Sequence, residues 1–242
     1  MKKVKLGISA CLLGEKVRYD GGHKKDPLIL ESFGRHTELV PFCPEAGCGL
    51  GVPREPLYLK WSGKNPRVVT VRTGRDMTSL LETGCTGLLN RIERQALWGF
   101  IVKSRSPSCG PEVVVQGPRG PSTAKGLFVR MAGERFPLLP VEDDEALHCP
   151  EVRRHFLRRL FMLKRWRDLA KRGRNKERLL AFHDRHRLAM GACSEGHGRE
   201  LDQLVARAHR VRPSRLYGDY ERLLLECLSR CTANVADHQI DF

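Results

Sequence analysis

Short apolar runs and helical periodicity alternate over the first 140 residues. Six brief apolar or alternating runs predict strands, at 5–13, 38–42, 67–72, 98–102, 113–115 and 127–131. Leucine and isoleucine recur at helical spacing over 77–97, which predicts an amphipathic helix among these strands. Helices that alternate with short buried strands are typical of an α/β domain with parallel strand pairs.

From residue 142 onward the spacing of apolar residues becomes helical. Acidic residues at 142–145 suit a linker or a helix start, and Pro213 separates the last two predicted helices. Four helices are predicted, over 151–172, 177–190, 195–211 and 219–231. We therefore expect an α/β, Rossmann-like parallel-sheet domain at 1–147, followed by an all-α helical domain at 148–242.

Charge adds a candidate partner to this picture. The 242 residues include 43 Lys and Arg and 28 Asp and Glu, a net charge of +15, and 40% hydrophobic residues argue against wholesale disorder. Residues 151–187 alone hold 14 basic and 4 acidic side chains. Such a run is either a solvated helix face or a footprint for phosphates, and its density favours phosphates. The candidate RNA contacts are Arg153, Arg154, Arg158 and Arg159.

The amino terminus bears on location. No run of about 18 apolar residues exists, and the first 22 residues lack a cleavage site, so we expect neither a membrane partner nor a signal peptide. The expected location is cytoplasmic. The chain has nine cysteines, and in that compartment metal binding, catalysis or burial explains cysteines better than disulfides do.

Three of the cysteines share a position relative to the strands. Cys11, Cys43 and Cys109, here called the motif cysteines, each follow a predicted strand. Carboxyl ends of parallel strands meet at one sheet edge, where ligand sites lie, so these thiols can converge. Three thiolates can ligate three irons of a [4Fe-4S] cluster and leave the fourth iron open as a Lewis acid. Spacing alone leaves three ordinary buried thiols as the alternative.

Longer motifs surround these cysteines. They are ISACLLG at 8–14, VRYDG at 17–21, CPE at 43–45, GLGVPR at 49–54 and KSRSPSCG at 103–110. Over residues 4–147 the chain closely resembles the TudS-like thiouracil desulfurases. The resemblance implies an α/β domain whose three motif cysteines hold a [4Fe-4S] cluster. It also implies that the open iron takes the sulfur of a thiolated pyrimidine, which water replaces without net redox change.

The helical segment carries a second resemblance. FHxxHRL at 182–188 and SxxHxxEL at 194–201 are similar to the YbgA-like domain that is often fused behind that module. Fused proteins of this kind resemble desulfidases of tRNA, which implies conversion of 4-thiouridine to uridine with release of sulfide, the helical domain holding the RNA. Such domains run further toward the carboxyl terminus, which leaves open whether 148–242 is complete.

Candidate catalytic groups lie beside the motif cysteines. Glu45, two residues after Cys43, is the candidate acid or base, with turn capping as the alternative. Ser106 is the hydroxyl that the family pattern favours for catalysis. Candidate substrate contacts are Asp20, Lys103 and Ser108, of which Asp20 fits a turn cap equally well. Arg54 is a candidate structural ion-pair partner.

Other interpretations of the cysteines, the histidines and the function compete with a three-cysteine cluster. Cys48 could add a fourth ligand, which would close the open iron, and we interpret it as non-ligating. His183, His186 and His197 could bind a metal, but packing, capping or RNA contacts are more common for such residues. No dinucleotide cofactor is expected. The competing functions are desulfuration of free thiouracil and a non-catalytic RNA-binding or redox-sensing protein.

Overall fold

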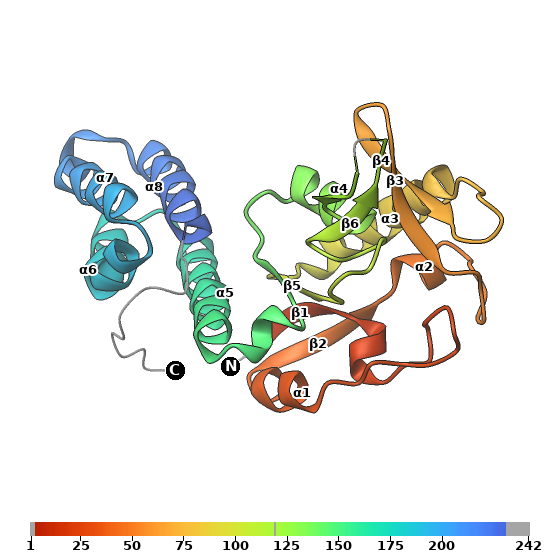
Figure 1. Cartoon of the computed structure of the whole chain (residues 1–242). Coiled ribbons are helices and arrows are strands. Elements are labelled where there is room, and N and C mark those ends of the chain that lie inside the picture. The colour runs from red at the N-terminus through yellow and green to blue at the C-terminus, as the bar shows by residue number, and fades with distance from the viewer. Residues whose placement is uncertain (1–2, 119, 231–242) are drawn as a thin grey trace. The chain divides into compact units, whose positions relative to one another are not determined.

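The computed structural model describes residues 3–118 and 120–230. The chain divides into two compact units, Met1–His148 and Cys149–Phe242 (Figure 1). Each unit is described by itself below. Within the described ranges, no helix is both long and apolar enough to cross a membrane.

A four-stranded parallel sheet forms the centre of the first unit. Its strands, in spatial order, are β2 (Thr37–Phe42), β1 (Val4–Ser9), β5 (Phe100–Val102) and β8 (Val141–Asp143). The close β1–β5 pairing depends on Gly7, because a Cβ there would lie 2.6 Å from the Phe100 ring. The predicted α/β parallel-sheet class, followed by helices, is confirmed.

The helices between the strands of this sheet are η1 (Ala10–Leu13), α1 (Pro27–Gly34), α2 (Pro44–Gly47), α3 (Thr78–Gln95) and α4 (Leu127–Arg135). A short helix, η2 (Ala146–His148), follows the last strand. α3 corresponds to the helix predicted over 77–97, and its buried Leu81, Cys85 and Leu88 follow helical spacing. Behind the sheet edge, the rings of Phe42, Phe100 and Phe128 pack with centroids 4.7–5.8 Å apart.

A second sheet, of mixed direction, is not hydrogen-bonded to the first but shares its hydrophobic core. It consists of β4 (Asn65–Thr70), β3 (Leu57–Ser62), β6 (Val113–Gln116) and β7 (Ser122–Ala124). The runs at 67–72 and 113–115 are therefore strands, but they belong to this sheet. β3 and β7 were not predicted. β3 pairs antiparallel with β4 across a tight turn at Gly63, whose φ of +71° suits glycine.

The strand predicted at 127–131 is wrong, because these residues begin helix α4. A short apolar run does not distinguish a strand from a buried helix segment. Here Leu127, Phe128 and Ala132 are buried, and Arg130 pairs with Glu82 of α3 at 3.3 Å. The helix is therefore determined by packing against α3 rather than by the local pattern.

The second unit is a helical bundle (Figure 1). It contains α5 (Pro150–Lys171), α6 (Lys176–Cys193), α7 (Glu195–Ala206), η3 (Ala208–Arg210) and α8 (Pro213–Ser229). The helix predicted over 195–211 therefore ends early, and Pro213 begins α8, where its fixed φ suits the first turn. Buried Trp166 stacks on Tyr220 with ring centroids 4.9 Å apart. Residue 231, the last of the predicted 219–231 helix, lies outside the described residues.

One cysteine departs from the expectation that the thiols stay reduced. Cys193, the last residue of α6, is disulfide-bonded. The motif cysteines are free.

Candidate active site

The motif cysteines lie on three loops that follow β1, β2 and β5. These strands are neighbours and run parallel, so their carboxyl ends share one edge of the sheet. All three cysteines line a single cavity of about 700 Å³. Parallel pairing therefore brings together thiols that are up to 98 residues apart in the sequence.

The first two loops are short and fixed by backbone hydrogen bonds. η1 carries Cys11 and ends at Gly14, which has a φ of +99° and donates its N–H to the Cys11 carbonyl at 3.2 Å. Cys43 caps α2, and its Sγ accepts the Ala46 N–H at 3.5 Å. A sulfur that accepts N–H bonds is suited to the thiolate form.

The third loop is held by the start of α4. The N–H of Leu127 donates to the Pro107 carbonyl at 3.2 Å, and that of Phe128 donates to the Ser108 carbonyl at 2.7 Å. Gly126 permits this contact, since a Cβ there would lie 2.9 Å from the Ser106 carbonyl oxygen. The first residues of α4 thus hold the loop that carries Cys109.

Burial raises the pKa values of the three motif cysteines in the metal-free protein. Desolvation raises the pKa of Cys11 to about 12, with the nearby thiols of Cys109 and Cys43 adding to the shift. Desolvation likewise raises the pKa of Cys43 to about 11 and raises that of Cys109. The thiols are therefore neutral until a metal displaces their protons.

Glu45 lies at the centre of a hydrogen-bonded chain on the cavity wall. Its Oε1 accepts from the Ser108 hydroxyl at 2.6 Å, and Ser106 Oγ lies 3.0 Å from Ser108 Oγ. Its Oε2 accepts from Arg54 Nε and pairs with Nη2, both at 2.7 Å. Arg54 also donates to the Val17 carbonyl at 2.8 Å, which ties Glu45 to the loop after β1. Arg54 is thus an ion-pair partner.

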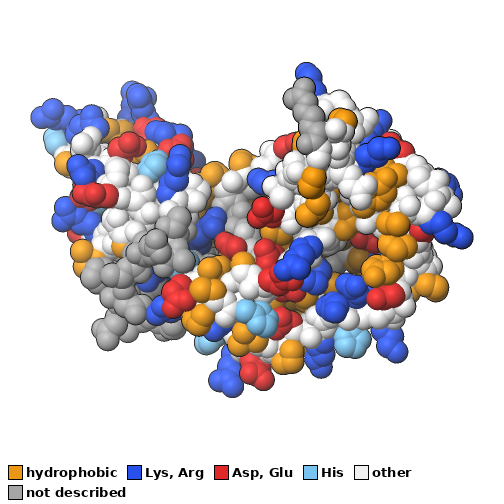
Figure 2. Space-filling model, in the orientation of Figure 1, with side chains coloured by type: hydrophobic (Ala, Val, Ile, Leu, Met, Phe, Trp, Pro, Cys, Tyr) orange, Lys and Arg blue, Asp and Glu red, His pale blue; other side chains and the backbone are white. Residues whose placement is uncertain are grey.

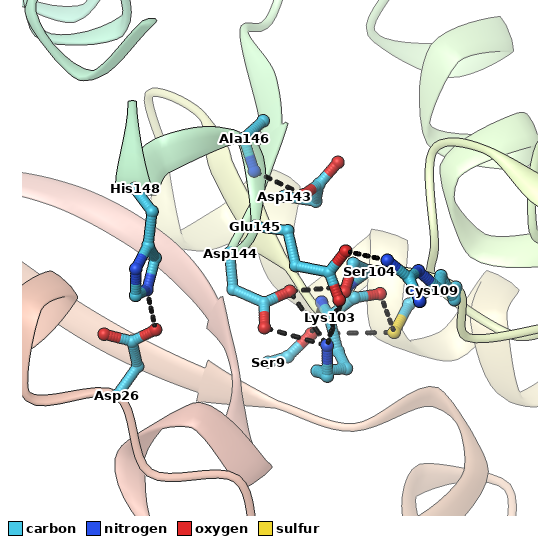
Figure 3. A network of polar contacts seen from close by, with 11 residues as sticks. Ser9, Asp26, Lys103, Ser104, Cys109, Asp143, Asp144, Glu145, Ala146 and His148 are labelled. Carbon is cyan, nitrogen blue, oxygen red and sulfur yellow. Dashed lines mark hydrogen bonds and ion pairs between the residues drawn. The ribbon is translucent and has the colours of Figure 1, made fainter. Parts of the chain in front are cut away.

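Lys103 is anchored by a residue that sequence reasoning missed. Its Nζ donates to Asp144 Oδ1 and Oδ2 at 3.1 and 2.8 Å, as Figure 3 shows. Asp144 is buried and also accepts the Ser104 N–H at 2.6 Å, so it fixes both the ammonium group and the start of the loop. The sequence offered no signal for this pair, because its partners lie 41 residues apart.

Asp20 does not line the cavity with the other candidates. Its Oδ1 accepts the Gly22 N–H at 2.9 Å, which is the turn-capping alternative that the sequence left open. This hydrogen bond, with Arg18 nearby, holds the pKa of the Asp20 carboxyl below its usual range. Arg18 lines the cavity and was missed, although it stands in the same VRYDG motif.

Cys48 also lies outside the residues that line the cavity. Its Sγ donates to the Glu45 carbonyl at 3.1 Å, and its Cβ lies against Gly84 of α3. Within the part of the chain that the structure describes, no three His, Cys, Asp or Glu side chains converge on a single metal ion. A four-iron cluster is larger than one ion and suits thiolates that stand further apart.

The candidate residues of the helical unit have structural partners. His183 is buried between Asp202 and Tyr220, at 2.9 and 3.2 Å, and Ser194 contacts His197 at 2.8 Å. Of the four arginines proposed to contact RNA, Arg154 is exposed, Arg153 and Arg159 are half-buried, and Arg158 is buried. They therefore do not form one exposed row along α5.

Comparison with known proteins bears on the first unit. The model of the 2-thiouracil desulfurase family matches residues 6–144, a segment that contains the three motif cysteines and every residue that lines the cavity except Glu145. The chain belongs to the 2-thiouracil desulfurase family. Two relatives illustrate the family. An uncharacterized protein, YbbK of Bacillus subtilis (strain 168), is 30% identical over 116 residues, which cover 46% of this chain and 76% of YbbK.

The second relative has a solved structure. It is a [4Fe-4S]-dependent thiouracil desulfidase, TudS, with 29% identity and a TM-score of 0.50, and the match covers 63% of this chain and 95% of TudS. The similarity agrees with the α/β fold described above. Residues 145–242 lie outside the family match, so the resemblance of the helical unit to a YbgA-like domain stays a prediction.

Proposed function

We propose that this chain is a [4Fe-4S]-dependent desulfidase that converts 4-thiouridine in tRNA to uridine and releases sulfide. Family membership and the likeness to TudS support the thiouracil chemistry. The observation that carries the proposal is the convergence of the motif cysteines on one cavity that Glu45 also lines.

The residues present fit such a cluster. The three motif cysteines around the cavity would supply three sulfur ligands, and Cys48 is turned toward α3. Positive side chains of Arg18 and Lys103 lie near the Cys11 thiol and favour its thiolate. When bound through three thiolates, the cluster supplies an open iron, a Lewis acid with affinity for the sulfur of the substrate.

The protein's own groups supply the proton transfers. Replacement of sulfur by water forms a C–O bond, breaks the C–S bond and leaves two water protons to be moved. The Glu45 carboxylate, which accepts a hydrogen bond from Ser108, can take one proton from the attacking water. The chain of Ser108 and Ser106 can return this proton to the departing sulfur, which leaves as HS⁻, and the second water proton passes to solvent. Arg54 holds the carboxylate in place during both steps.

Charge around the cavity favours an anionic substrate over a neutral base. Each carboxylate that lines it has a basic partner, in the pairs Arg54–Glu45, Lys103–Asp144, Arg105–Glu145 and His148–Asp26. Lys24 and Lys25 line it as further cations, and Arg18 lines it while it lies 3.5 Å from Asp20. A nucleotide phosphate fits this excess of positive charge, whereas a free thiouracil ring does not need it.

The test is desulfuration by anaerobically reconstituted protein. We expect loss of the thiocarbonyl absorbance of tRNA that contains 4-thiouridine, together with release of one sulfide per uridine formed. Glu45→Gln tests the role of the carboxylate, because it keeps the shape of the side chain. It should lower turnover about 100-fold or more while the cluster is retained. Turnover of free thiouracil without turnover of tRNA would reject the tRNA substrate, and no turnover of either by cluster-loaded protein would reject the enzyme.

A further inference from the structure

A groove in the helical unit is lined by arginines from separate segments of the chain. α7, η3 and the first half of α8 enclose about 1040 Å³. The arginines that line it are Arg207, Arg210, Arg212, Arg215 and Arg222. All five are exposed, and among the described lining residues only Glu200 and Asp219 are acidic. Figure 2 shows Lys and Arg side chains gathered at this end of the unit.

Contacts within the protein leave much of this charge uncompensated. Arg207 donates to the Gln203 carbonyl at 3.1 Å and Arg210 to a ring nitrogen of His209 at 3.0 Å, so both have neutral acceptors. Arg215 lies 3.6 Å from Asp219 and Arg222 lies 3.3 Å from Glu226, both exposed i,i+4 pairs on α8 of low stability. The groove therefore keeps a net positive charge that an anionic ligand can neutralise.

The start of α8 adds to this positive field. Arg212 is the N-cap of this 17-residue helix, and no side chain caps its first turn. Ser214 and Arg215, in that turn, line the groove. The positive end of the helix dipole and the first-turn N–H groups favour phosphate at this position, beside the arginine side chains.

We propose that this arginine groove binds the phosphate backbone of RNA. One guanidinium group can bind two phosphate oxygens at once, and the half-buried Leu204 and Val211 form apolar surface between the arginines that suits sugar faces. A strand with one charge per nucleotide and apolar faces between the charges matches this alternation. This inference rests on the proposed function, because it identifies the bound RNA as the thiolated tRNA.

Binding and its salt dependence provide the test. The whole chain would be titrated with fluorescent tRNA between 50 and 200 mM salt, and the same titration would be made with Arg207→Gln/Arg212→Gln/Arg215→Gln. We expect this triple variant to bind at least tenfold more weakly at 100 mM salt, with a salt slope lower by about three. The matched control, Arg35→Gln/Arg91→Gln/Arg94→Gln, removes three exposed charges elsewhere and should bind as the parent does.

The outcomes separate this inference from the proposed function. Unchanged affinity and slope in the groove variant, equal loss in the control variant, or no tRNA binding by the parent chain would each overturn the groove. Poly-glutamate that binds as tightly as tRNA would indicate an acidic protein partner and would also overturn it. Groove-dependent tRNA binding without desulfuration would reject the proposed substrate and leave the groove in place. Circular dichroism melting would confirm that each variant is folded.

Discussion

The Arg54–Glu45 pair allows a quantitative test of how the cavity wall is built. Arg54 donates to Glu45 and to the carbonyls of Val17 and Gly51, and the two charged side chains are only 8% and 13% exposed. Arg54→Met keeps an unbranched apolar stem but leaves the Glu45 carboxylate without its cation. Removing one member of a largely buried pair costs about 3 kcal/mol of unfolding free energy, because the remaining charge stays desolvated.

The assay is thermal unfolding of the metal-free protein, so that cluster binding does not add to the measured stability. A loss of about 3 kcal/mol corresponds to a melting temperature roughly 6–12 °C lower. Arg54→Lys is the matched control: it keeps the charge without the planar fork and should lose about half as much. Arg54→Met/Glu45→Gln should recover part of the loss, since no charge is then left unpaired.

Two results would refute this reasoning. If Arg54→Met melted within 2 °C of the parent by the scale of about 2–4 °C per kcal/mol, the pair would contribute little to stability. If the losses of the single variants simply added in the double variant, Arg54 would act through Val17 and Gly51 rather than through Glu45.

Three further predictions follow from the same structure. Replacing any motif cysteine by alanine should remove most iron and sulfide from anaerobically purified protein, whereas Cys48→Ala should retain both; iron loss in Cys48→Ala would contradict the three-ligand arrangement. Gly84→Ala should destabilise by about 1–3 kcal/mol in denaturant unfolding, because its Cβ would lie 2.3 Å from that of Cys48. Gly87→Ala, on the same helix with open space around it, should be neutral or stabilising because alanine has the higher helix propensity, and equal changes in the two variants would show that the contact with Cys48 has no effect on stability. Burial and the neighbouring arginines lower the pKa of His186 to about 4, so protonation favours unfolding and the helical unit should lose stability as pH falls from about 6.5 to 4; an NMR titration with a ring pKa near 6.5 would contradict this.

The position of the cavity could be predicted from the sequence because its determinants are local. Each motif cysteine follows an apolar run, and parallel pairing of β1, β2 and β5 places the three strand ends together without further information. The turns that carry the cysteines are also local, as with the left-handed Gly14 that closes η1. Strand ends and turn residues were therefore sufficient to locate the cavity.

The partners of the charged residues could not be predicted in this way. Lys103 was assigned to substrate on its position alone, and the structure gives its ammonium group a buried carboxylate, Asp144, from β8 and the residues that follow it. The strand prediction for 127–131 was wrong for a related reason, since packing against α3 makes this segment a helix. In both cases the deciding contact joins segments that are far apart in the sequence.

Charge along the chain and charge on the surface also differ for a physical reason. The dense basic run begins in α5, but a helix turns neighbouring arginines about 100° apart around its axis. Arg158 is therefore buried, while Arg159 next to it is only half-buried. In the arginine groove the density along the chain is lower, yet the bend at η3 and the start of α8 turn Arg207, Arg212 and Arg215 toward one concavity. A phosphate backbone responds to the positive potential of charges that are close together in space, not to their density along the sequence. This potential is screened over a Debye length of about 10 Å at 0.1 M salt. Neutralising groove arginines should therefore weaken RNA binding more than neutralising the same number of arginines in α5.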